Sequence, residues 1–204
     1  MGVKVSGLIE TRKALRKLAP DLYKEMNREI GAAMRVVVKD ARGMVEPSVN
    51  GLYNWQDRGT LVKSRSSRER AFPKYNSQVI KKGLTYSIGK SRKNKSGFVS
   101  LYSLLNKSAA GSIIETAGRK NGMDGDSRSQ SNNRRAGEHF NRSIQGTYGG
   151  FSKIGKGRYD QGRLMAKAID RNEGKAQDAI FKAIDKTTKA FYARTSTVGA
   201  SRAA

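Results

Sequence analysis

The chain has no cysteine, one histidine and three prolines among its 204 residues. Without cysteine it can form neither a disulfide bond nor a thiolate metal site. It has no apolar run approaching the ~18–20 residues that cross a bilayer, and its N-terminus lacks the apolar core of a signal peptide. These absences exclude a disulfide scaffold, and we expect no membrane partner.

Acidic residues are also scarce, since 17 Asp and Glu stand against 41 Lys and Arg and give a net charge of +24. A charge this high repels itself, and an anionic partner would relieve the repulsion. Nucleic acid, an anionic membrane surface and acidic protein surfaces all fit, while the simplest alternative is that the basic residues only keep the protein soluble. Because the few carboxylates do not cluster, paired-carboxylate acid–base catalysis lacks material.

Catalytic and metal-binding motifs are missing too. His139 is the only histidine, and a lone histidine makes a weak metal site. Asp124 and Asp126 resemble the start of a calcium loop, but the later ligand positions do not follow. The glycine-rich run 146–158 lacks the Gly-Lys-Ser/Thr ending of a P-loop, and no Ser–His–Asp set is recognisable. We expect no enzymatic activity, no cofactor and no metal.

Apolar residues at helical spacing predict a helix near each end of the chain. The first begins at about residue 7, breaks or restarts at Pro20 and ends between Gly43 and Pro47, because proline disfavours a helical residue before it. The second covers about 160–194. The two apolar stripes comprise Leu22, Met26, Ile30, Ala33, Val37, Ala41 and Met44, and then Ala176, Ile180, Ala183, Ile184, Thr187 and Phe191.

Residues 79–117 predict three short strands in an antiparallel meander, because apolar and polar residues alternate there. The aromatic side chains in this region, Tyr86, Phe98 and Tyr102, are expected to pack in the core rather than to stack on bases. The stretches at about 50–78 and 118–158 predict long loops, since they hold few large apolar residues. We expect one α+β domain over residues 1–204, with an N-terminal and a C-terminal helix on a small antiparallel sheet.

The positive charge is concentrated in these loops, since residues 51–160 carry 22 basic and seven acidic side chains. Basic loops rich in glycine and serine suit contacts to phosphates that carry no sequence information. Acidic protein surfaces are the other partner that fits. The candidate contact residues are Arg65, Arg68, Arg70, Lys90, Arg92, Lys93, Lys95, Arg119, Lys120, Arg134 and Arg135.

The order of several short motifs completes the pattern. The N-terminal helix ends in Ala41 and Arg42, followed by Pro47, Gly51 and Leu52; then come Glu115 and Gly118, and finally Arg163, Ala166 and Ala168–Asp170. This order resembles the tail-completion (neck) family of long-tailed bacteriophages over about two-thirds of the chain. The chain departs from the family pattern by lacking a proline before the last helix and by its long insertion at 119–158.

The resemblance implies an α+β protomer that assembles as a ring, expected to be a hexamer, at the head-proximal end of a phage tail. Its partners would be tail-tube and head-connector proteins and the packaged DNA in the lumen. It would be located in the virion, and in the host cytoplasm during assembly. Two alternatives stay open, a tail-terminator ring and a stand-alone nucleic-acid-binding protein without sequence preference.

Overall fold

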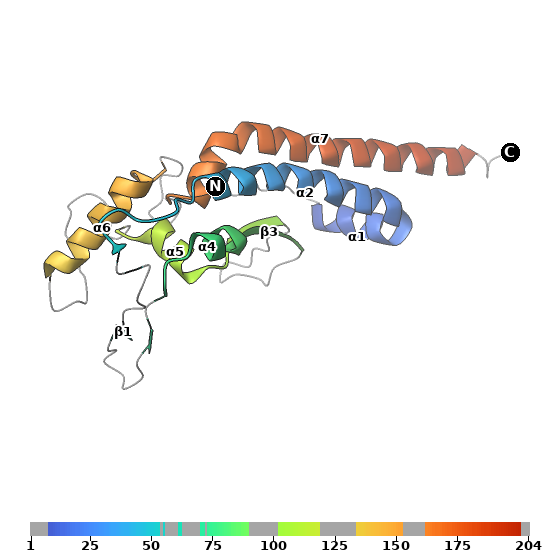
Figure 1. Cartoon of the computed structure of the whole chain (residues 1–204). Helices are drawn as coiled ribbons and strands as arrows, with labels where there is room; N and C mark the ends of the chain where they lie inside the picture. Colours follow the sequence, from blue (N-terminus) through green and yellow to red (C-terminus); the bar gives the residue numbers. More distant parts are fainter. Residues whose placement is uncertain are drawn as a thin grey trace. The chain divides into compact units, whose positions relative to one another are not determined.

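The computed structural model describes residues 8–53, 55, 61–62, 70–71, 73–89, 102–118, 134–152 and 162–200 (Figure 1). Its strands form two small sheets, in which β1 pairs with β2 and β3 pairs with β4. The predicted α+β class is confirmed. In chain order the elements are α1 (Leu8–Leu18), α2 (Pro20–Gly43), β1 (Leu61–Val62), β2 (Arg70–Ala71), α4 (Ser77–Gly83), β3 (Leu84–Ile88), β4 (Tyr102–Asn106), α5 (Ala109–Thr116), α6 (Arg134–Tyr148) and α7 (Met165–Ala200).

The chain divides into two compact units. The first unit comprises Met1–Val36, Ile88–Leu101 and Asn172–Ala204, and the second comprises Val37–Ser87 and Tyr102–Arg171. Helices α2 and α7 each contribute residues to both units. The expectation of a single domain over the whole chain stays a prediction.

In the first unit, the break between α1 and α2 falls where the sequence predicts it. The amide of Ala19 donates to the Leu15 carbonyl at 2.8 Å, and α2 then begins with Pro20. Proline suits this position because the first amides of a helix have no intrahelical acceptor. Arg12 of α1 donates a 2.9 Å hydrogen bond to the Tyr23 hydroxyl of α2, which holds the pKa of that phenol below its usual value.

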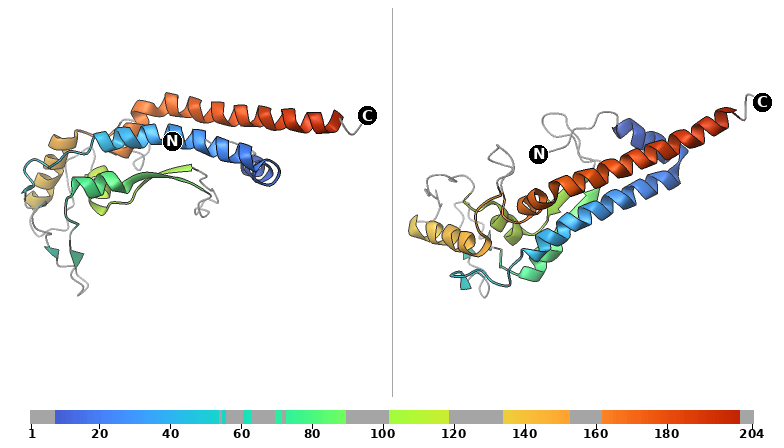
Figure 2. Two further views of the ribbon diagram at one scale, coloured as in Figure 1. Left: turned by 45° about the vertical axis from the view of Figure 1, so that its right-hand side comes forward. Right: turned by 90° about the horizontal axis from the view of Figure 1, so that it is seen from above.

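Helices α2 and α7 lie side by side in the first unit (Figures 1 and 2). The predicted stripe of α2 is buried in this unit at Leu22, Met26, Ile30 and Ala33. On α7, Ala183 and Thr187 are buried, and the Thr187 hydroxyl is satisfied by the Ala183 carbonyl at 2.8 Å. Burying each large apolar side chain contributes about 1.5–3 kcal/mol, so this stripe stabilises the first unit.

In the second unit, the last turns of α2 are anchored to the strand that follows α4. Val37 and Ala41 continue the buried stripe, and α2 ends at Gly43, within the predicted interval. The Arg42 guanidinium donates two hydrogen bonds to the Leu84 carbonyl, at 3.0 Å from Nε and 2.7 Å from Nη2. Arg42 therefore links the end of α2 to the start of β3.

The prediction of a three-stranded meander is wrong in two places. The third strand was expected at residues 112–118, but residues 112–116 belong to the helix α5, whose first turn is capped by the Ser108 hydroxyl accepting from the Gly111 amide at 3.2 Å. The expected first strand begins instead as α4, which is capped by the Asn76 side chain. Local side-chain caps thus outweigh the β propensity of the apolar residues.

The region expected as a long loop at 118–158 contains α6, a helix of 15 residues. The region at 50–78 contains the antiparallel pair β1–β2, with Leu61 opposite Ala71. Helix α7 reaches Ala200, beyond the predicted end near residue 194.

Candidate polyanion and assembly interface

Most of the predicted contact residues lie outside the described residues. Arg70 lies in β2, opposite Val62, and Arg134 and Arg135 begin α6. The others, which lie outside the described part of the chain, are Arg65, Arg68, Lys90, Arg92, Lys93, Lys95, Arg119 and Lys120.

Arg134 and Arg135 stand at an unfavourable end of their helix. The first turn of α6 contains no acidic residue and begins with these two arginines. A helix N-terminus carries partial positive charge, so basic residues there cost a few tenths of a kcal/mol.

In the second unit, the ends of three helices meet around Glu115, and we call this place the helix-end junction. The sequence indicates Glu115 only as part of a motif. The Glu115 carboxylate accepts from three backbone amides at the start of α7, at 2.7 Å from Leu164, 3.0 Å from Met165 and 2.9 Å from Ala166. A carboxylate suits this place because it satisfies unpaired amides and complements the helix dipole. A residue of α5 thus caps a helix that begins about fifty positions later.

Gly162 makes this approach possible. A Cβ at Gly162 would overlap the Glu115 carboxylate, so a larger residue there would displace the carboxylate from the amides that it caps. Gly118, with φ of 77°, ends α5 in the left-handed conformation that glycine adopts without strain. Both glycines therefore have a steric role at this junction.

Arg163 binds the opposite kind of helix end at the same junction. Its guanidinium is buried and donates to the carbonyls of Ile114 at 3.2 Å, Ala117 at 2.6 Å and Gly149 at 3.1 Å. These carbonyls lie at the C-terminal ends of α5 and α6, where the helix dipole favours a cation. The Phe151 ring lies against the guanidinium, 3.8 Å from the ring centroid to Cζ. Glu115 and Arg163 together fix the ends of three helices.

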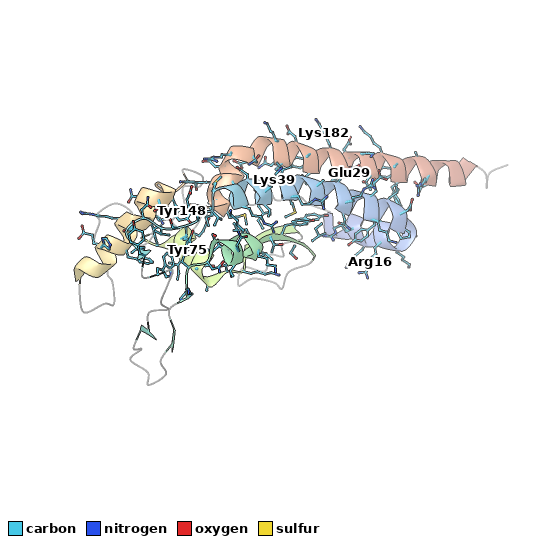
Figure 3. All side chains as sticks on the ribbon, in the orientation of Figure 1. Arg16, Glu29, Lys39, Tyr75, Tyr148 and Lys182 are labelled. Atoms are coloured by element: carbon cyan, nitrogen blue, oxygen red, sulfur yellow. The ribbon has the colours of Figure 1, made fainter. Side chains whose placement is uncertain are left out.

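A buried pair of tyrosines anchors α6. The hydroxyls of Tyr75 and Tyr148 lie 2.6 Å apart, and Tyr75 also donates to the Glu46 carbonyl (Figure 3). Because the Tyr75 hydroxyl donates its hydrogen to the Glu46 carbonyl, the Tyr148 hydroxyl is the donor in the hydrogen bond between the two tyrosines. Burial raises the pKa of both phenols. Trp55 packs against Tyr75 and Phe140, with ring centroids 5.3 and 5.0 Å apart, and extends the cluster towards the middle of α6.

The one histidine of the chain contacts the protein backbone. His139 is exposed on α6, and its Nε2 lies 3.0 Å from the Gly51 carbonyl. Its neighbour Glu138 pairs with Arg142 at 2.6 Å. Among the described residues, no group of three His, Cys, Asp or Glu side chains is placed to hold a metal ion. Tyr86 and Tyr102 are half-buried on β3 and β4, while Phe98 lies outside the described residues.

In the first unit, the acidic side chains of α2 face α7. The Lys186 ammonium lies 2.8 Å from Glu25 and 2.7 Å from Glu29, and Arg194 lies 2.7 Å from Asp21. These contacts lower the pKa of Asp21 and Glu25 and raise that of Lys186. The helix pair is therefore joined by ion pairs.

Comparisons with protein-family models, curated proteins and solved structures found no match.

Within the described residues, no helix is both long enough and apolar enough to cross a membrane.

Proposed function

We propose that this chain is a structural protein of the neck of a long-tailed phage, which forms a ring that completes the tail and joins it to the head around the DNA channel. The proposal assigns it no catalytic activity. Its partners are further copies of itself, tail-tube and head-connector proteins, and the DNA in the lumen.

The observation that carries the proposal is the role of the motif residues. Glu115, Gly118 and Arg163, on which the resemblance to the tail-completion family rests, are the residues of the helix-end junction. Arg42, from the first motif, makes the double hydrogen bond to Leu84. Residues that are scattered in the sequence thus have linked structural roles, as motif residues of a shared fold would.

The distribution of charge also supports a partner that is a polyanion. The net charge of +24 per chain would be multiplied in a ring, and a polyanion or acidic neighbours would relieve the resulting repulsion. DNA within the lumen would have this effect.

The small sheets support assembly. Each sheet among the described residues has two strands, and two-stranded sheets are marginally stable alone. A strand from a neighbouring subunit could extend such a sheet at its edge. A ring of identical subunits would supply such a neighbour.

The experiment that tests the proposal is the oligomeric mass of the purified protein, measured by light scattering at moderate salt with and without DNA. A discrete ring without DNA, or a monomer that forms a ring only with tail components, supports the neck function. A monomer that coats DNA in proportion to DNA length overturns it and favours the stand-alone nucleic-acid-binding protein. A ring that stops the growth of tail tubes in vitro, without joining heads, would favour the tail terminator.

Reversal of the charge of Arg134 and Arg135 tests the role proposed for the start of α6. Arg134→Glu with Arg135→Glu should abolish head joining or DNA passage while the protein stays folded. Acidic residues in the first turn complement the helix dipole, so this change should leave α6 intact. Unchanged head joining, or loss of the helical circular-dichroism signal, would contradict the role given to this segment.

A further inference from the structure

Helix α7 carries a second apolar stripe next to the one that is buried in the first unit. Ala183 and Thr187 are buried, and Ile184 and Thr188 follow them by one residue, which is about 100° around the helix. The second stripe is only half-buried, and its Phe181 side chain is 45% exposed. We call this stripe the α7 seam, and its members are Gln177, Phe181, Ile184, Thr188 and Phe191.

The α7 seam has the spacing of a surface that packs along another helix. Its members recur at steps of four, three, four and three residues, which is the heptad pattern of paired helices. Its polar members are already satisfied within α7. The Thr188 hydroxyl donates to the Ile184 carbonyl at 2.9 Å, and the Gln177 amide donates to the Glu173 carboxylate at 3.0 Å. The seam can therefore be covered by a helix without leaving these groups unpaired.

Charged residues alternate in sign along one edge of the seam. In chain order they are Asp178, Lys182, Asp185 and Lys189, all of them exposed, and Asp185 pairs with Lys189 at 2.8 Å. Read from the other end, the order of the signs is reversed. In an antiparallel pair of identical helices, a two-fold axis across the contact places the same edge of both helices side by side. Such a pair therefore brings the cations of one edge to the anions of the other.

We propose that the α7 seam binds the α7 seam of a second copy of this chain in an antiparallel pair. The two-fold axis lies midway between Phe181 and Ile184 along the helix. Phe181 of each copy then packs against Ile184 of the other, and Gln177 lies opposite Thr188 of the other copy. The exposed Phe181 ring is thus buried twice in each dimer.

The same register matches the charged edges. Asp178 comes within about 3 Å, measured along the helix axis, of the level of Lys189 in the other copy, and Asp185 has the same relation to Lys182. Each edge contributes two anions and two cations, so the edge is complementary to its own reverse. A lipid surface fits the seam less well, because Asp178 and Asp185 at its edge would meet anionic headgroups.

The expected dimer is weak. Five half-exposed side chains offer on the order of 400 Å² per copy, about half of the ~800 Å² that each partner buries in a standard interface. Repulsion between two chains of charge +24 also opposes pairing. A two-fold contact does not join neighbours within a six-membered cyclic ring, so the α7 pair is independent of the proposed neck ring.

Sedimentation velocity of the full chain at moderate salt, over a wide range of protein concentration, tests the pair. Phe181→Glu places a carboxylate in the seam, and its matched control is Val79→Glu on α4, where the wild-type side chain is also apolar and is 57% exposed. The wild type and Val79→Glu should pass from monomer to dimer as the concentration rises. Phe181→Glu should raise the dissociation constant at least about tenfold, because each dimer would bury two carboxylates.

A wild type that stays monomeric at every concentration would overturn the proposal, and so would equal weakening of the dimer by Phe181→Glu and Val79→Glu. Far-UV circular dichroism checks that both variants are folded.

Cysteine cross-linking tests the direction of the pair without changing Phe181. The chain has no cysteine, so an introduced one is its only thiol. Oxidation of a mixture of Gln177→Cys and Thr188→Cys chains, one of them carrying a size tag, should link the two different chains. Each variant alone should stay unlinked, because its two thiols lie about 16 Å apart along the pair, beyond the reach of a disulfide. Linkage of Gln177→Cys to itself would indicate a parallel pair and overturn the antiparallel register.

The outcomes separate this pair from the neck proposal. Rings that form from the wild type and from Phe181→Glu alike, with no linked dimer from the mixed cysteine variants, would overturn the pair and leave the neck function standing. A linked mixed dimer that is lost when Phe181→Glu is added to both chains would support the pair, even where no ring forms with tail components and the neck function fails.

Discussion

Removal of the Glu115 carboxylate should destabilise the second unit more than any other single charge change among the contacts described above. Glu115→Gln keeps the size of the side chain but turns a carboxylate, which accepts from three amides at 2.7–3.0 Å, into a group with one acceptor oxygen. A hydrogen bond to a charged group contributes about 1.5–3 kcal/mol, and one acceptor is retained. We expect a loss of about 2–3 kcal/mol for Gln and about 3–5 kcal/mol for Ala.

Thermal unfolding followed by far-UV circular dichroism measures this loss. For a chain of this size, 1 kcal/mol lowers Tm by about 2–4 °C, so Glu115→Gln should lower it by roughly 5–10 °C. The matched control is Glu138→Gln, which removes an exposed pair with Arg142 on a single helix. That control should cost less than about 0.5 kcal/mol.

Hydrogen exchange gives a second, local readout of the same change. In Glu115→Gln the amides of Leu164, Met165 and Ala166 should exchange faster than those of later residues in α7, because they lose their acceptor. If Glu115→Gln and Glu138→Gln lower Tm equally, or if these three amides keep their protection, the carboxylate does not cap α7 and the account of the junction is refuted.

Three other changes have clear expected outcomes. Val37→Asp places an unpaired charge in the buried stripe, and we expect loss of soluble folded protein, checked by yield and circular dichroism; a well-folded variant would contradict the stripe. Gly162→Ala should lower the free energy of unfolding by about 2 kcal/mol or more, because the new Cβ meets the Glu115 carboxylate. Gly174→Ala should raise it by about 0.5–1 kcal/mol, because Gly174 lies in α7 with open space around it. Equal effects of the two variants in thermal melts would contradict this. Hydrogen bonds from α7 lower the pKa of the Asp21 and Glu25 carboxyls, so the stability from these ion pairs is present above the ordinary carboxyl pKa of about 4 and is lost as the pH falls through the lowered values. Melts from neutral to acid pH should show this loss at low salt and a smaller one at high salt, and the same loss at both would argue against surface ion pairs.

The sequence predicts the long helices well because their signal is local and repeated. Every position of the α2 stripe from Leu22 to Ala41 is buried. The helix begins at Pro20 and ends at Gly43, shortly before Pro47. The stripe of α7 is weaker, with Ala183 and Thr187 buried and the remaining positions half-buried. Its helix was still predicted, since periodicity survives partial exposure.

The prediction fails where short elements depend on a single cap. Residues 112–114 read as a strand because two isoleucines lie together, yet Ser108 starts a helix there through one hydrogen bond to Gly111. The sequence predicts a loop where α6 lies, because this stretch holds few large apolar residues. Its buried side consists mainly of Ile144 and Tyr148, and Tyr148 finds its partner Tyr75 at a distance of 73 residues in the chain. A pairing at that separation has no local pattern.

The side that each charge faces cannot be obtained from a count of charges by segment. Residues 1–50 carry ten basic and six acidic side chains, a modest excess. In the structure, Asp21, Glu25 and Glu29 point towards α7, while Lys24 and Arg28 remain exposed on the outside. The potential felt by a partner depends on the side that each charge faces, and not on the sum over a segment.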